Sequence, residues 1–130
     1  MNILTHLMFQ DGRAREAAGW YVSLVPGSSI ERVTDNDAGG ATVYFTLADQ
    51  GFIAFDSPIR HEFDFTPSMS IFVRCEDEEQ VRALFEQIAS DGKVMMPLAD
   101  YGFSSCFGWV ADRYGVSWQI GTADRELARA

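Results

Sequence analysis

The chain repeats itself at an offset of 64 residues, and this repeat constrains the fold more than any other feature of the sequence. Apolar residues follow the helical i, i+3, i+4, i+7 spacing once in each half, and short apolar runs typical of strands surround each helix. The segments that coincide at this offset are 6–9 with 70–73, 17–24 with 81–88, 41–45 with 105–109, and 51–55 with 115–119. The sequence therefore predicts two copies of one unit, each with a strand, a helix and three further strands.

Turn residues and helix-capping signals set the expected boundaries within each copy. Asp77, followed three residues later by Gln80, predicts the start of the second helix, and Gly92 is predicted to end it at the C′ position. The expected strands are about 3–9, 29–34, 41–49 and 51–56 in the first copy, and about 68–75, 93–97, 105–112 and 115–120 in the second.

One βαβββ unit is too small to bury a sheet alone, so two units are expected to fold together. This predicts an α+β fold in which two tandem βαβββ modules form one curved mixed sheet with the helices outside. The concave face of that sheet is the expected pocket. The 130 residues match a single domain, 1–130, with module one at 1–57, a linker at 58–67, module two at 68–120 and a polar tail at 121–130.

Composition narrows the possible partners. Nineteen acidic residues against ten basic residues give a net charge of −9, which repels phosphate backbones and anionic lipids, so we expect neither nucleic acid nor a membrane as a partner. No apolar run approaches the ~20 residues of a membrane-spanning helix. Two cysteines and an N-terminus without a signal-peptide pattern predict reduced thiols and a cytoplasmic location.

Six segments of this chain resemble the vicinal oxygen chelate superfamily, also called the glyoxalase/bleomycin-resistance/dioxygenase fold. Within it the chain looks like the PhnB-like branch, often labelled 3-demethylubiquinone-9 3-methyltransferase. The segments that carry the resemblance are 6–12, 20–24, 65–73, 91–98, 107–112 and 115–119. The resemblance implies paired βαβββ modules and a homodimer.

Metal-dependent members of that superfamily hold an ion with four residues, and the resemblance maps those positions onto His6, Phe55, Ser70 and Gln119. Only His6 is a strong ligand, and Gln119 is a weak second candidate, because Phe55 has no donor atom and a serine hydroxyl binds metals poorly. We therefore expect no metal site. The sequence also has no Gly-X-Gly run to hold S-adenosylmethionine, so no cofactor is predicted and methyl transfer is not expected from these residues.

Seven residues are the candidates for a ligand pocket: His6, Phe55, Ser70, Tyr101, Cys106, Trp109 and Gln119. Ten Phe, four Tyr and three Trp residues exceed the need of two thin layers, so some of these rings are expected to line an apolar pocket or a subunit contact. The favoured hypothesis is metal-free binding of a small apolar or aromatic molecule. The alternative is a divergent metal-dependent lyase, isomerase or dioxygenase, or a metal-free enzyme that uses His6 as a base; no catalytic residue is assigned.

Overall fold

The computed structural model describes residues 1–123 and divides the chain into two compact units, Met1–Phe63 and a second that begins at Asp64. The division falls inside the predicted linker, 58–67. Most of the predicted tail, 124–130, lies outside the described residues.

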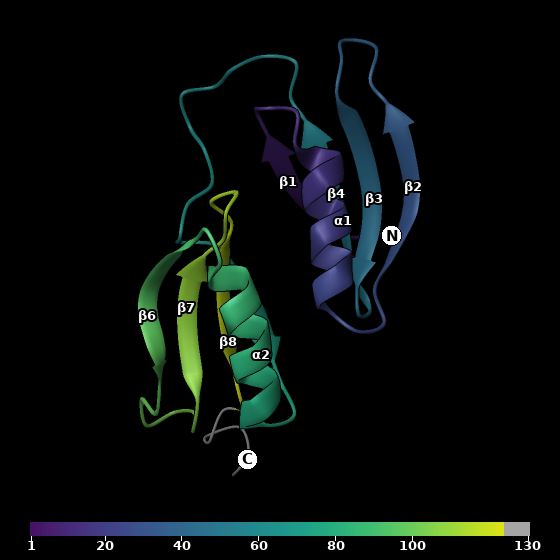
Figure 1. Cartoon of the computed structure of the whole chain (residues 1–130). Helices are drawn as coiled ribbons and strands as arrows, with labels where there is room; N and C mark the ends of the chain where they lie inside the picture. Colours follow the sequence, from purple (N-terminus) through teal and green to yellow (C-terminus); the bar gives the residue numbers. More distant parts are fainter. Residues whose placement is uncertain (124–130) are drawn as a thin grey trace. The chain divides into compact units, whose positions relative to one another are not determined.

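Unit 1 contains one helix and one four-stranded sheet, here called sheet 1 (Figure 1). Its strands lie in the order β1-β4-β3-β2, with β1 parallel to β4 and the other pairs antiparallel. The elements are β1 (Thr5–Phe9), α1 (Ala14–Leu24), β2 (Ser29–Asp35), β3 (Ala41–Leu47) and β4 (Gln50–Asp56).

Unit 2 has the same topology, and its sheet is called sheet 2 (Figure 1). Its strands lie in the order β5-β8-β7-β6, with β5 parallel to β8 and the other pairs antiparallel. The elements are β5 (Ser70–Arg74), α2 (Glu78–Ala89), β6 (Lys93–Ala99), β7 (Phe107–Ala111) and β8 (Ser117–Gly121). The expected α+β class and the two βαβββ modules are confirmed, with one four-stranded mixed sheet in each module.

Each sheet has one face covered by its helix and one face that the helix leaves uncovered, here called its open face. In sheet 1, alternate residues of β3 such as Val43 and Phe45 are buried, and the Phe45 ring lies 6.3 Å from that of Tyr21 in α1. In sheet 2, Val110 and Trp118 are fully buried neighbours on β7 and β8. These apolar contacts with the helices form the core of each unit.

The 64-residue offset places the residues of β7 on the wrong face. It aligns Phe45 with Trp109, yet Phe45 is buried on the helix side whereas Trp109 is half-buried on the open face. The cause is the length of the hairpin turn. The last pair before the turn is Leu47↔Gln50 in β3–β4 and Ala111↔Ser117 in β7–β8, so the turn of β7–β8 is longer. A shift by an odd number of residues moves every side chain of a strand to the opposite face.

The two predicted ends of α2 have different outcomes. Asp77 is the N-cap as predicted, and its side chain accepts a hydrogen bond from the Gln80 backbone N–H at 2.8 Å. The prediction for Gly92 is wrong, since Ser90 is the C-cap and the left-handed residue after it is Asp91, with φ 60°. Gly92 is required for space instead, because a Cβ there would lie 2.4 Å from the carbonyl oxygen of Ala111.

Substituting Asp77→Ala is expected to lower the free energy of unfolding by about 1 kcal/mol, because it leaves the first turn of α2 without a side-chain cap. Chemical denaturation followed by circular dichroism measures the change. Asp77→Asn is the matched control, since asparagine caps a helix about as well as aspartate. Equal losses in the two variants would contradict the capping role.

Candidate functional site

The open face of sheet 2 collects the polar and aromatic residues best placed to meet a small molecule. Strand register sets these residues in three rows across the sheet. From β5 to β6 the rows are Ser70, Ser117, Ala111 and Lys93; then Phe72, Gln119, Trp109 and Met96; then Arg74, Gly121, Phe107 and Ala99. Paired residues point to the same side of a sheet, so each row lies on one face.

Four of these residues form a hydrogen-bonded cluster, here called the serine cluster. The Trp109 indole N–H donates to the Ser117 hydroxyl at 2.8 Å. The Ser117 and Ser70 hydroxyls lie 2.6 Å apart, and the Gln119 side-chain N–H donates to the Ser70 hydroxyl at 3.2 Å. The structure therefore brings three of the predicted site residues into one network.

An aromatic cluster lies beside the serine cluster on the same unit. Phe107 is its centre, with the rings of Phe103, Tyr101 and Phe72 at 4.9, 6.0 and 6.4 Å from it. Phe72 is paired with Gln119 and is 51% exposed, so its ring is accessible next to the polar residues. Apolar rings beside a few polar groups are the composition usual for a ligand site.

Two other predicted residues occupy sheet 1. His6 and Phe55 lie on the open face of that sheet, since their strand neighbours Leu7 and Ala54 are buried, and the two rings lie 5.6 Å apart. His6 is exposed. The structure thus pairs His6 with Phe55 in unit 1, and Ser70 with Gln119 in unit 2.

Two predicted pocket residues do not offer a reactive group to a ligand. Cys106 is 1% exposed, so its side chain packs as a small buried apolar group. The other cysteine, Cys75, is also buried, and its thiol has a raised pKa because of burial first and then the nearby Asp77 and Cys106. The Tyr101 hydroxyl donates to the Pro97 carbonyl at 2.6 Å, which leaves its ring as the part that contacts neighbours.

Ser117, Phe72 and Phe107 lie on this face but were not among the seven candidate residues. Ser117 is 1% exposed and links Trp109 to Ser70, a role that no spacing in the sequence indicates. Phe72 was detectable, because it lies two residues after the candidate Ser70 and therefore on the same side of the same strand.

The residues at the four superfamily metal positions do not fit a divalent ion. The donor set is one imidazole, one hydroxyl and one amide, with none from Phe55, and the Ser70 hydroxyl is already hydrogen-bonded to Ser117 and Gln119. Within residues 1–123, no group of three or more His, Cys, Asp or Glu side chains is arranged to hold a metal.

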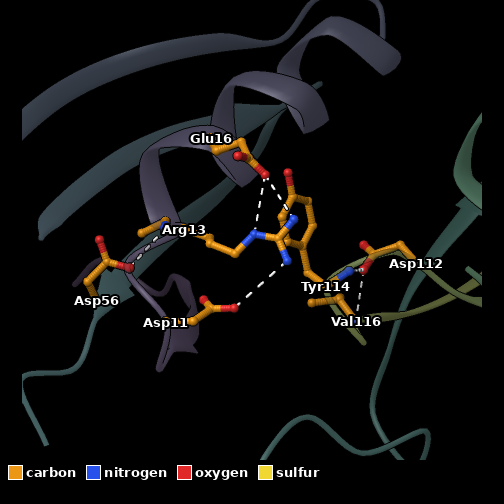
Figure 2. A network of polar contacts seen from close by, with 8 residues as sticks. Asp11, Arg13, Glu16, Asp56, Asp112, Tyr114 and Val116 are labelled. Atoms are coloured by element: carbon orange, nitrogen blue, oxygen red, sulfur yellow. Dashed lines mark hydrogen bonds and ion pairs between the residues drawn. The ribbon is translucent and has the colours of Figure 1, made fainter. Parts of the chain in front are cut away.

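The N-termini of both helices are occupied by carboxylates of the chain (Figure 2 shows that of α1). The Asp56 side chain accepts from the Ala14 backbone N–H at 2.9 Å and, with its other oxygen, from the Ala41 N–H at 2.9 Å. At the start of α2, the Asp77 side chain accepts a hydrogen bond from the Gln80 backbone N–H. Helix N-termini are a common place for the anionic groups of a cofactor; here those amides are already bonded, so the turns do not fit S-adenosylmethionine.

Two hollows of about 410 and 430 Å³ lie in unit 1, and neither includes a predicted site residue. The first lies at the N-terminal end of α1, where Arg15 is paired with Asp35 at 2.8 Å. The second lies beside the β3–β4 hairpin and includes Tyr44 and Phe52. Their exposed charges and turn residues are typical of ordinary surface, so the open face of sheet 2 is the stronger candidate.

Neither helix of the described residues has the length and apolarity needed to cross a membrane. No curated protein matches the chain in sequence. A family model described as 3-demethylubiquinone-9 3-methyltransferase matches residues 1–121.

Solved structures give the closer comparisons. The PhnB protein of Bacillus cereus is 43% identical, with a TM-score of 0.89 over 95% of this chain and 100% of its own. Protein PA1353 of Pseudomonas aeruginosa is 22% identical, with a TM-score of 0.80 over 95% of this chain and 98% of its own. A third structure is a variant of the fosfomycin resistance protein FosX of Listeria monocytogenes, solved with Mn(II) and a dihydroxypropylphosphonic acid. It is 11% identical, with a TM-score of 0.70 over 100% of this chain and 98% of its own. The last two likenesses establish the shared fold.

Proposed function

We propose that this chain, which belongs to the family described as 3-demethylubiquinone-9 3-methyltransferase, the PhnB-like branch of the vicinal oxygen chelate fold, binds a small aromatic molecule without a metal. The binding surface is the open face of sheet 2. The observation that carries the proposal is the serine cluster beside the half-exposed ring of Phe72.

The arrangement is suited to binding because its polar groups are held in place before a ligand arrives. Ser70, Ser117, Trp109 and Gln119 fix one another through hydrogen bonds, so few side chains lose rotamer freedom on binding. The aromatic cluster supplies the apolar contact area. Polar groups of fixed position orient a ligand, and the rings supply most of the affinity.

The alternative is a divergent metal-dependent enzyme, because the chain shares its fold with FosX, which was solved with Mn(II). It is the weaker candidate because the donor set at the four metal positions is incomplete. Methyl transfer, which the family description names, is also not proposed, since both helix N-termini already bind carboxylates of the chain. The homodimer stays a prediction.

Binding is tested by titrating the full chain with 8-anilinonaphthalene-1-sulfonate and following the probe's fluorescence. Substituting Phe72→Ala is expected to weaken binding about two- to tenfold, because a stacked aromatic contact is worth about 0.5–1.5 kcal/mol. Phe63→Ala is the matched control, since Phe63 is 62% exposed but lies outside both sheets. Equal affinities in the two variants would contradict binding on this face.

The same titration after treatment with a metal chelator separates the two hypotheses. Unchanged affinity supports metal-free binding. Loss of binding on chelation, restored by Mn(II) or Zn(II) and abolished by His6→Ala, would favour the metal-dependent alternative.

A further inference from the structure

The strands of sheet 2 differ sharply in charge from the rest of the chain. β5, β6, β7 and β8 contain two basic residues, Arg74 and Lys93, and no acidic residue. All 19 acidic residues of the chain lie outside these four strands, and sheet 1 includes three of them. Basic residues on strands without acids, in a protein of net charge −9, are suited to an anionic ligand, because the rest of the chain is mostly acidic.

Arg74 is placed to meet such an anion on the open face. Its guanidinium lies over the Phe72 ring, 5.1 Å from the ring centre, so the side chain reaches from its own row toward the middle row. Among the described residues, no carboxylate lies within 4 Å of this guanidinium. Arg74 therefore retains its capacity to bind a ligand carboxylate.

The serine cluster provides a hydrogen-bond donor at the other end of β5. The two serine hydroxyls carry two hydrogens, and the bond between them uses one. Trp109 and Gln119 both donate into this pair, so neither accepts the second hydrogen. One hydroxyl hydrogen is thus left without an acceptor among residues 1–123. Ser70 is the more exposed of the two serines, and a ligand can accept the hydrogen there.

We propose that the ligand of this face is a planar aromatic carboxylate that carries a hydrogen-bond acceptor, such as a carbonyl, at its opposite end. The inference rests on the proposed function and names its substrate class. The carboxylate pairs with Arg74, the ligand ring packs against the part of Phe72 that the guanidinium leaves uncovered, and the carbonyl accepts from Ser70. Ser70 and Arg74 are the first and last residues of β5, about 13 Å apart at ~3.3 Å per residue, and the Arg74 side chain shortens that span.

Calorimetry with three related probes tests each end of the ligand. The wild-type chain is expected to bind 4-acetylbenzoate about tenfold more tightly than 4-acetylbenzamide, which lacks the charge, and more tightly than 4-ethylbenzoate, which lacks the acceptor. Arg74→Gln should abolish the preference over the benzamide while keeping the preference over the ethyl compound. Ser70→Ala should do the reverse. Arg82→Gln, an exposed arginine on α2, is the control and should change neither preference.

The outcomes separate this inference from the proposed function. If all three probes bind the wild-type chain equally, the carboxylate and acceptor assignments are overturned while aromatic binding stands. If none binds, the inference is overturned, and the naphthalene titration with Phe72→Ala decides whether the proposed function fails with it. Preferences that persist unchanged in both variants also overturn it, since they would arise from other residues.

Discussion

Replacing Asp112 with alanine is expected to lower the free energy of unfolding by about 4 kcal/mol. Asp112 is buried, and its two oxygens accept hydrogen bonds from the Tyr114 and Val116 backbone N–H groups and from the Trp118 indole N–H (Figure 2 shows the two backbone bonds). A hydrogen bond to a charged acceptor contributes roughly 1.5–3 kcal/mol, and the fully buried indole N–H of Trp118 would lose its acceptor.

Urea denaturation followed by tryptophan fluorescence measures this loss, with an unchanged m-value expected. Asp49→Ala is the control, because Asp49 is an exposed aspartate in the β3–β4 hairpin, the equivalent turn of unit 1. A loss below about 1 kcal/mol for Asp112→Ala would show that water or a neighbouring group replaces the carboxylate, and the proposed role of this residue in closing the β7–β8 turn would be wrong.

Replacing Asp56 with alanine is expected to cost about 3 kcal/mol. This buried carboxylate joins two elements of unit 1, since one oxygen accepts from Ala14 at the start of α1 and the other from Ala41 at the start of β3. Arg13, the N-cap residue of α1, makes no side-chain capping bond, so Asp56 is the group that caps this helix from the sheet. Alanine would leave two buried backbone N–H groups without a partner.

Circular dichroism during denaturation measures the effect, and Asp35→Ala is the control. Asp35 also lies near α1 and pairs with Arg15, but its side chain is 87% exposed, so its loss should change stability by less than about 0.5 kcal/mol. Similar losses in the two variants would contradict the capping role of Asp56.

Local patterns in the sequence predicted much of the fold. Both helices follow the i, i+3, i+4, i+7 spacing around Ala17 and Val81, and their buried faces include those residues. The start of α2 at Asp77 was predictable because the capping bond joins residues only three positions apart. Periodicity and capping depend on neighbours in the chain, so a sequence shows them directly.

Two features of unit 2, the face on which Trp109 lies and the role of Gly92, were not predictable from the sequence. The offset that aligned the candidate Trp109 with Phe45 placed the two on the same face, whereas the longer β7–β8 turn puts them on opposite faces. Gly92 was recognised as a helix-ending residue, whereas its role is to let the backbone of Ala111 approach. The first error arises from the length of a hairpin turn, and the second from a close contact between segments distant in sequence.

The sequence by itself determined the element order, the two βαβββ modules and the membership of Ser70, Trp109 and Gln119 in a candidate site, because periodicity, turn residues and family motifs are local. Only the tertiary structure showed that Ser117 links those three residues and that Asp56 caps a helix 42 residues away. It also showed that Arg74 lies over Phe72 on sheet 2, whose strands contain no acidic residue. The reason is physical: strand register decides which side chains meet, and register is set by pairing across the sheet.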